Sequence, residues 1–200
     1  MRTIGLTGGI ASGKSLVSQW LVERGAAVVD ADKVGHEAYR RGSATFDAVV
    51  EAFGDDIVGA DGEIDRKALG PKVFGDEKAR KRLEGIVWPA MRRMMEERIA
   101  ELRAQGTEVT VLEAALLIEA DWLPLVDEVW LVTASPDTVR ERLMARNSLT
   151  PEQAESRIKA QLSNDERRPY ANVVIENDGT AEELRRVVNE TWSRLQAQVS

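Results

Sequence analysis

The sequence predicts an α/β fold in which helices flank a mainly parallel, five-stranded sheet. Three observations carry this prediction. Short apolar runs of strand length alternate along the chain with longer stretches of helical period, a pattern typical of parallel sheets. Neither a repeat of fixed period nor a low-complexity linker interrupts this alternation. The length of 200 residues suits one domain with excursions.

The individual elements follow from periodicity and from turn residues. The predicted strands are the apolar runs at residues 3–7, 27–30, 109–112, 129–132 and 173–175. Helical spacing of apolar residues predicts helices over residues 14–23, 76–104, 137–146, 151–162 and 181–196. In this order strands and helices alternate, which is the connection that parallel neighbours need.

Two connections are longer than a crossover helix requires. About eighty residues separate the second predicted strand from the third, whereas most connections take only a few. We therefore predict a single domain with its core at residues 1–31, 105–135 and 170–200, a mostly helical insert at about 32–104 and a lid at about 136–169. The predicted lid is polar, helical and rich in arginine, as a mobile cover over a site would be.

The composition excludes several kinds of binding partner and chemical site. Charged residues make up 30% of the chain and the formal net charge is -7, so we expect no nucleic acid to bind a general basic surface. The chain contains no cysteine, which excludes disulfides, thiolate metal sites and cysteine nucleophiles. The first residues lack the long apolar run of a signal peptide or a membrane span. We therefore expect a cytoplasmic protein without membrane contact.

The segment GLTGGIASGKSL at residues 5–16 fits the pattern G-x-x-x-x-G-K-[ST] of a phosphate-binding loop. Glycines in the loop allow backbone angles that turn amide N–H groups toward phosphate oxygens. The following helix directs its positive N-terminal end at the same anion. Lys14 can reach the β- and γ-phosphates, and the Ser15 hydroxyl can ligate Mg²⁺. A chance glycine turn is the alternative, and the strand before the loop and the helix after it disfavour that alternative.

Several kinds of protein share such a loop, and other parts of the sequence separate them. A GTP-dependent switch should carry an N-K-x-D motif after a later strand, and no such segment occurs. A motor ATPase needs a hydrophobic strand that ends in a water-polarising carboxylate, and VTVLE at residues 109–113 offers only a weak version. A small-molecule kinase needs an acceptor pocket, a carboxylate near the acceptor hydroxyl and a closing lid with arginines. The chain has candidates for all of these parts, so we interpret the loop as part of a phosphotransferase.

The second predicted strand ends in two aspartates, within VVDAD at residues 28–32. The carboxyl edge of an open α/β sheet borders the ligand crevice. Asp30 and Asp32 are two positions apart and would point to one side of an extended chain. One could accept the proton of an attacking hydroxyl while the other orients the acceptor or Mg²⁺. For Asp30, capping of the following helix is an equally good interpretation, whereas for Asp32 we favour catalysis.

Arg142 and Arg146 are the predicted lid arginines. They are four residues apart, so they share one face of a helix, and guanidinium groups suit the binding of phosphoryl oxygens. The alternative is an ordinary solvated, charged helix. In the insert, Arg66 follows a tight turn and is a candidate acceptor-phosphate ligand or one half of a structural salt bridge. For His36 we favour a solvated helix position over a phosphate contact.

Further segments resemble those of the dephospho-coenzyme A kinase family. GLTGGIASGKS and VVDAD resemble the family's phosphate loop and second strand. The resemblance continues at Asp65-Arg66 with Leu69, Val73 and Phe74, at Leu83-Glu84 and Trp88-Pro89, at Leu116 to Glu119, and from Gln161 to Gly179. Ordered motifs over nearly the whole length are more specific than the phosphate loop alone, which many unrelated enzymes share.

The resemblance implies a P-loop kinase fold and transfer of the ATP γ-phosphoryl group to the ribose 3′-hydroxyl of dephospho-CoA, with Mg²⁺. Carried over to this sequence, the phosphate-binding residues are Gly8, Ala11, Ser12, Gly13, Lys14, Ser15 and Leu16, with Ser15 as the metal ligand. Asp32 would be the base, with Lys14 and Thr7 beside the reacting groups. The insert at about 32–104 would bind the acceptor. Arg142 would act in catalysis and Arg146 in nucleotide binding. ATP and dephospho-CoA are thus the expected partners of a monomer, with an oligomer as the alternative.

A few positions depart from the family's pattern. Leu16 stands where a threonine is usual, which removes a hydroxyl but keeps the backbone N–H; Trp88 replaces a histidine, and Ala115 replaces a proline. We expect an active enzyme because both parts of the reaction centre, GKS and DAD, are intact. The alternatives are another P-loop nucleoside or nucleoside monophosphate kinase, and a nucleotide-binding regulator without turnover.

Overall fold

The computed structural model describes residues 1–147 and 149–199, so residue 148 of the predicted lid and residue 200 of the predicted core lie outside the described residues. The chain divides into two compact units. The first is formed by Met1–Val29 with Ile99–Ser200, and the second by Asp30–Arg98. The first unit holds the sheet, and the second is helical.

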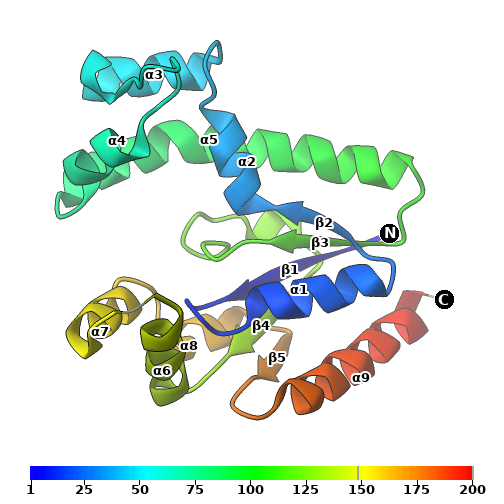
Figure 1. Cartoon of the computed structure of the whole chain (residues 1–200). Coiled ribbons are helices and arrows are strands. Elements are labelled where there is room, and N and C mark those ends of the chain that lie inside the picture. Colours follow the sequence, from blue (N-terminus) through cyan, green and yellow to red (C-terminus); the bar gives the residue numbers. More distant parts are fainter. Residues whose placement is uncertain (148, 200) are drawn as a thin grey trace. The chain divides into compact units, whose positions relative to one another are not determined.

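The predicted α/β fold with a five-stranded sheet is confirmed. The strands are β1 (Arg2–Gly8), β2 (Ala27–Asp30), β3 (Val109–Glu113), β4 (Glu128–Thr133) and β5 (Val173–Glu176), in the order β2-β3-β1-β4-β5 (Figure 1). β1 pairs in parallel with both β3 and β4, and β4 pairs in parallel with β5. Each strand lies where the apolar runs predict it.

The helices of the first unit also follow the prediction. They are α1 (Lys14–Glu23), α6 (Pro136–Asn147), α7 (Pro151–Lys159), α8 (Asn164–Arg167) and α9 (Ala181–Val199), with 3₁₀ turns at Leu123–Leu125 and Arg168–Tyr170. The helix predicted over 151–162 is too long, because α7 ends at Lys159 and Ser163 caps a new helix. Ser163 and Glu166 form a capping box, which supplies partners for the first N–H groups of α8.

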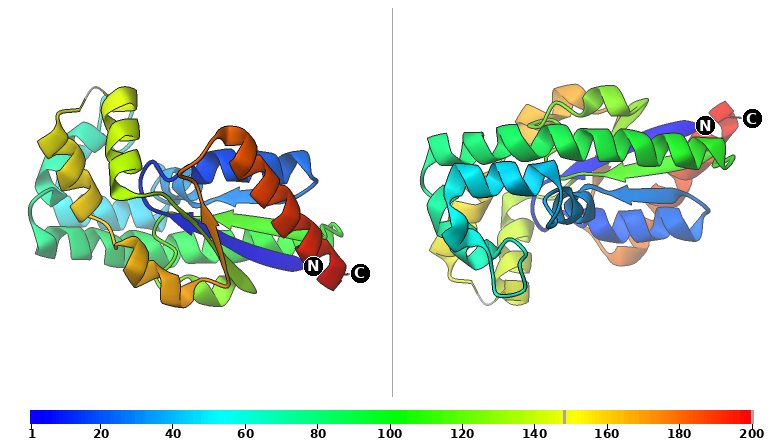
Figure 2. Two further views of the ribbon diagram at one scale, coloured as in Figure 1. Left: turned by 90° about the horizontal axis from the view of Figure 1, so that it is seen from below. Right: turned by 90° about the horizontal axis from the view of Figure 1, so that it is seen from above.

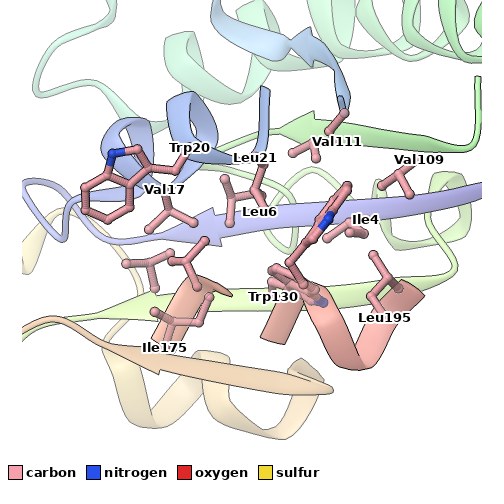
Figure 3. Packing of buried hydrophobic residues seen from close by; sticks show 14 of the residues in the cluster. Ile4, Leu6, Val17, Trp20, Leu21, Val109, Val111, Trp130, Ile175 and Leu195 are labelled. Carbon is pink, nitrogen blue, oxygen red and sulfur yellow. The ribbon is translucent and has the colours of Figure 1, made fainter. Parts of the chain in front are cut away.

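One face of the sheet is covered by α1 and α9, which lie side by side (Figures 1 and 2). The strand residues that pack against these helices alternate along each strand, as a pleated strand requires. They are Ile4, Leu6, Val109, Val111, Trp130, Val132 and Ile175 (Figure 3). Their helix partners are Val17, Trp20, Leu21, Leu184, Val188, Trp192 and Leu195. Burial of each large apolar side chain contributes about 1.5–3 kcal/mol, so this core fixes α1 and the loop before it.

The opposite face of β1 is covered by the segment between β3 and β4. A side chain at Gly5 has no room there, because its Cβ would lie 2.6 Å from Leu117 Cδ2 and 3.1 Å from Val126 Cγ2. Leu117 and Trp122 of this segment are buried. A larger residue at position 5 would force the Leu117 and Val126 side chains to shift, so close packing rather than a turn favours glycine there.

The second unit consists of α2 (Ala31–Ala38), α3 (Ala44–Phe53), α4 (Arg66–Val73) and most of α5 (Glu77–Ala104), with a 3₁₀ turn at Asp55–Ile57. Its buried residues include Val34, Val49, Ile57, Leu69, Met91 and Met95. An ion pair between Arg98 and Glu37 joins α5 to α2. The boundaries of an acceptor-binding insert and of a lid stay predictions.

Among the residues that the structure describes, no helix combines the length and the apolar content that a membrane crossing needs.

Candidate active site

The glycine-rich loop lies at the carboxyl edge of the sheet, between β1 and α1. Gly8 ends β1 beside Val132 of β4, and a Cβ at Gly8 would lie 2.4 Å from the Val132 carbonyl oxygen. Gly13 has a φ of 96°, in the left-handed region that favours glycine. A Cβ there would lie 2.2 Å from Asn177 Nδ2. Space requires glycine at both positions, and the backbone angle requires it at Gly13 as well.

Ala11 adopts a φ of 57°, which a residue with a side chain rarely takes up. Left-handed backbone costs such a residue about 1–2 kcal/mol. Alternating backbone angles of this kind turn successive N–H groups toward one point and so form a concave anion site. Local strain of this type is typical of functional loops.

A cavity of about 700 Å³ opens over the loop. Its volume is that of a site for a small ligand. The lining residues are Gly8 to Leu16, Ala115, Arg142, Ala145, Arg146 and Gln161. All the predicted phosphate-binding residues and both predicted lid arginines therefore line one cavity.

Lys14 and Ser15 both contact Glu113, the last residue of β3. Lys14 Nζ lies 2.9 Å from Glu113 Oε1, and the Ser15 hydroxyl donates to the same oxygen at 3.2 Å. Burial raises the pKa of Glu113, but hydrogen bonds from Lys14, Ser18 and Ser15 and the Lys14 charge outweigh it and leave that pKa below its ordinary value. Glu113 is therefore an ionised carboxylate at neutral pH.

Sequence reasoning missed Glu113 as part of this site. The segment VTVLE was considered only as a weak motor-ATPase motif. The missing information was the strand order: β3 pairs directly with β1, with Leu6 opposite Glu113, although β2 lies between them in the chain. The last residue of a parallel neighbour of β1 must lie near the loop that leaves β1. A carboxylate at the end of an apolar strand was the signal that could have found it.

The predicted lid arginines differ in their surroundings. Arg142 Nη2 donates to the Asn177 carbonyl oxygen at 2.9 Å and to its Oδ1 at 3.3 Å, and Nη1 donates to the Ala11 carbonyl oxygen at 3.4 Å. Arg146 lies one turn further along α6, is exposed and lines the cavity. α6 packs beside α7 (Figure 2). Arg142 thus contacts the phosphate loop directly at Ala11 and is linked to Ser12 through Asn177, a residue that the sequence reasoning did not single out.

Thr7 and Leu16 lie at the two ends of the loop. Thr7 is fully buried in β1, and its hydroxyl donates to the Ala115 carbonyl oxygen at 3.4 Å. Its place beside the reacting groups stays a prediction. The Leu16 side chain packs against the core under α1, and its N–H donates to the Gly13 carbonyl oxygen at 3.0 Å. The missing threonine hydroxyl at this position is thus replaced by apolar packing.

The prediction that Asp30 and Asp32 share one side of an extended chain is wrong. β2 ends at Asp30, and Asp32 lies in the first turn of α2. Asp30 Oδ1 accepts hydrogen bonds from the N–H groups of Asp32 at 3.0 Å and Lys33 at 3.2 Å. Unpaired N–H groups at a helix start need such an acceptor, so Asp30 is the N-cap. The Asp32 side chain is exposed.

In the second unit, Arg66 and His36 come together. Arg66 Nη1 lies 2.5 Å from His36 Nε2, and the guanidinium carbon lies 5.7 Å from the centre of the Tyr39 ring. His36, expected to be a solvated helix residue, is exposed but contacts Arg66. A cation over an aromatic face is favourable. Arg66 is therefore oriented by α2, and a phosphate-binding role for it stays a prediction.

Comparison with known proteins adds a second kind of observation. A family model described as dephospho-CoA kinase matches residues 2–183. The chain belongs to the dephospho-CoA kinase family. A dephospho-CoA kinase from Geobacter sulfurreducens is 50% identical to this kinase over 194 residues, which are 97% of this chain and 98% of the relative. Another from Symbiobacterium thermophilum is 45% identical over 192 residues, or 96% of this chain and 80% of the relative.

Solved structures agree with the fold. A Thermus thermophilus protein of known crystal structure has a TM-score of 0.81 to this kinase at 34% sequence identity, with 97% of each chain covered. A shikimate kinase from Bacteroides thetaiotaomicron has a TM-score of 0.55 at 14% identity, with 98% of each chain covered, and shares the fold. The predicted P-loop kinase fold and the predicted family are confirmed. As a member of that family, the protein is an ATP-dependent kinase.

Proposed function

We propose that this kinase transfers the γ-phosphoryl group of ATP, in the presence of Mg²⁺, to the ribose 3′-hydroxyl of dephospho-CoA and releases CoA and ADP. The observation that carries the proposal is the single cavity lined by the phosphate loop, Arg142 and Arg146. Family membership supplies the acceptor. We further propose that the enzyme acts as a cytoplasmic monomer on these small molecules, in keeping with its net charge of -7.

The phosphate loop and the arginines stabilise the transferred group. N–H groups of the loop and the N-terminal end of α1 face the phosphates, and they are held in place before ATP binds. The Lys14 ammonium neutralises charge on the β- and γ-phosphates as the bond between them loosens. Arg142 and Arg146 bind the oxygens of the moving phosphoryl group and exclude water, which would otherwise compete with the acceptor.

Mg²⁺ fits the oxygen atoms beside Lys14. The Ser15 hydroxyl and Glu113 Oε1 lie 3.2 Å apart, and hydroxyl and carboxylate oxygens are donors that Mg²⁺ prefers. Within the described part of the chain, no group of three or more His, Cys, Asp or Glu side chains could hold a metal ion. Bound beside Lys14, Mg²⁺ would neutralise charge on the β- and γ-phosphates.

Asp32 is the proposed base. As the 3′-oxygen of the acceptor bonds to the γ-phosphorus, the bond from that phosphorus to the β-phosphate oxygen breaks, and the hydroxyl proton passes to an Asp32 carboxylate oxygen. The Asp32 side chain is exposed in the first turn of α2, where it can approach a hydroxyl. The ADP that forms would leave with part of its charge balanced by Lys14.

A panel of acceptors tests the proposed reaction. The purified enzyme is incubated with ATP and Mg²⁺ and, in separate reactions, dephospho-CoA, adenosine, AMP and CMP, and the products are read by mass spectrometry. We expect only dephospho-CoA to gain a phosphoryl group, and the product to co-elute with CoA. Phosphorylation of a nucleoside or of a nucleoside monophosphate, with dephospho-CoA left unchanged, would show a different kinase of this fold.

Replacing Glu113 with glutamine is expected to raise the Mg²⁺ concentration needed for half-maximal activity and to lower kcat, each by about 10- to 100-fold. The variant keeps the shape of the side chain but loses the charge beside Ser15 and Lys14. The measurement is a Mg²⁺ titration at fixed ATP and dephospho-CoA. Glu108→Gln, an identical change just before the other end of β3, is the control and should leave both quantities unchanged.

The same variant has an expected pH signature. Because folding lowers the pKa of Glu113, its charged form stabilises the native state above the ordinary carboxyl pKa. That stabilisation is lost as the pH falls through the lowered native-state value. The Tm of the wild type should therefore exceed that of Glu113→Gln at about pH 7, and the difference should shrink toward about pH 3. A difference that is constant over this range would mean that Glu113 does not contribute through its charge.

A further inference from the structure

We propose that Asn177 is a positioning residue for phosphoryl transfer, which fixes the phosphate loop through its side chain and Arg142 through its side chain and its backbone carbonyl. Asn177 is the first residue after β5 and is only 6% exposed. Its backbone N–H donates to the Thr133 carbonyl oxygen at 2.8 Å, which continues the pairing of β5 with β4. The side chain therefore projects from an anchored strand end. The inference rests on the ATP site of the proposed function, but not on the identity of the acceptor.

The first contact orients a peptide unit of the phosphate loop. Asn177 Nδ2 donates to the Ser12 carbonyl oxygen at 2.7 Å, and both residues are buried. The Ser12 carbonyl and the Gly13 N–H belong to one planar trans peptide unit, so they point in opposite directions. With the carbonyl held by Asn177, the Gly13 N–H must point to the other side of the loop. A rotated peptide unit would instead present a carbonyl oxygen to an incoming phosphate, which would repel it.

The second observation is a steric match between Asn177 and Gly13. A Cβ at Gly13 would lie 2.2 Å from Asn177 Nδ2. The amide group thus occupies the space that a side chain at position 13 would need. The glycine of the loop motif is required here because Asn177 packs directly against the backbone.

The third contact joins the same side chain to α6. Arg142 Nη2 donates to the Asn177 carbonyl oxygen at 2.9 Å and to Oδ1 at 3.3 Å, while Nη1 donates to the Ala11 carbonyl oxygen at 3.4 Å. Asn177 thus uses its amide nitrogen toward the loop and its oxygens toward the arginine. An amide is needed for this arrangement, because a carboxylate has no donor for the Ser12 carbonyl.

Asp178, the residue after Asn177, adds a further contact between the loop after β5 and α6. Asp178 Oδ1 accepts a hydrogen bond from the Ser135 N–H at 2.7 Å, just before α6 begins. The loop after β5 therefore holds both the start of α6 and, through Asn177, its Arg142. Buried supporting contacts of this kind keep a reacting group within the narrow tolerance that transfer requires, and a displacement of about 1 Å can cost about 10²-fold in rate.

A pair of identical substitutions at the two ends of β5 tests the proposal. Asn177→Asp removes the donor to Ser12 and places a carboxylate beside a carbonyl oxygen. Asn172→Asp is the matched control. Among the described residues, the Asn172 side chain uses only its oxygen, which accepts from the Val129 N–H at 2.7 Å, and aspartate keeps that oxygen. ATP affinity is measured by calorimetry without acceptor, kcat and KM with dephospho-CoA, and Tm without ligand.

We expect Asn177→Asp to weaken ATP binding at least about tenfold and to lower kcat about 10²-fold, with KM for dephospho-CoA unchanged. Asn172→Asp should match the wild type in all of these quantities. If Asn177→Asp lowers only the Tm and leaves ATP affinity and kcat at the wild-type level, Asn177 is merely structural and the proposal is overturned. Because ATP binding is read without acceptor, this result stands even if the wild type fails to phosphorylate dephospho-CoA, which would overturn the proposed function alone.

A double-mutant cycle tests whether Asn177 positions Arg142, and it does not use the charged variant Asn177→Asp. The variants are Asn177→Ala, Arg142→Ala and their combination. We expect the loss in kcat/KM for ATP caused by Arg142→Ala to be at least about fivefold smaller when Asn177 is already alanine, because contacting residues are not additive. Fully additive losses would show that the Asn177 side chain does not position Arg142.

Discussion

Replacing Lys14 with alanine is expected to lower kcat by about 10²- to 10³-fold, the loss typical of one preorganised electrostatic group. Lys14 lines the cavity, and its ammonium lies 2.9 Å from Glu113 Oε1 with both side chains 12% exposed. In the proposed function this charge would face the phosphates as they gather negative charge, so its contribution should be greatest in the transition state. Steady-state rates with ATP, Mg²⁺ and dephospho-CoA measure the effect.

Two controls separate this catalytic loss from a folding defect. Lys14→Ala also leaves the Glu113 carboxylate without its cationic partner. Breaking a mostly buried ion pair destabilises the folded state, so this variant should also have a lower Tm. The double variant Lys14→Ala/Glu113→Gln should regain Tm but not kcat. Lys81→Ala, which removes an exposed lysine paired with Glu77 in α5, should leave the rate unchanged. A Lys14→Ala enzyme with more than a tenth of the wild-type kcat would remove Lys14 from the proposed mechanism.

Replacing Asp32 with asparagine is expected to lower kcat by about 10²- to 10⁴-fold, the contribution of a positioned general base. The amide has the same shape as the carboxylate but cannot take a proton at neutral pH. The N–H of residue 32, which Asp30 caps, is retained, so α2 should form as before. We therefore expect unchanged KM values and an unchanged Tm, which separates a chemical defect from a structural one.

Asp30→Asn is the matched control for the base. Asparagine caps helices about as well as aspartate, so this variant keeps the start of α2 and should retain wild-type kcat. Wild-type rates in Asp32→Asn would exclude Asp32 as the base. A large loss in Asp30→Asn instead would transfer the role to the residue that the structure shows as the helix cap.

Much of the local structure could be predicted from the sequence because its causes are local. Alternating apolar residues placed the strands of the sheet, and the glycines around Lys14 placed the phosphate loop. The wrong prediction at Asp32 has a local cause as well. Sequence reasoning placed Asp30 and Asp32 on an extended chain, but the Asp30 side chain accepts the first N–H groups of α2, and the chain is helical from residue 31. A capping bond of this kind competes with strand extension at every such junction.

Glu113 and Asn177, which support the site, could not be predicted from local sequence patterns. Lys14 and Glu113 are 99 positions apart in the chain, and Ser12 and Asn177 are 165 apart. Neither pair is marked by a shared motif. They meet only because β1 is placed between β3 and β4, with β5 beside β4.

The sequence by itself determined the α/β class, the phosphate loop, the candidate lid arginines and, through ordered motifs over nearly the whole chain, the kinase family. Tertiary structure alone decided that Glu113 faces Lys14 and Ser15 and that Asn177 holds the loop and Arg142. The physical reason is that neighbouring residues determine the shape of a loop and the spacing of apolar residues in a helix. Strand order, in contrast, determines which side chains meet at the carboxyl edge of a sheet. Strand order depends on which apolar faces pack together in the core.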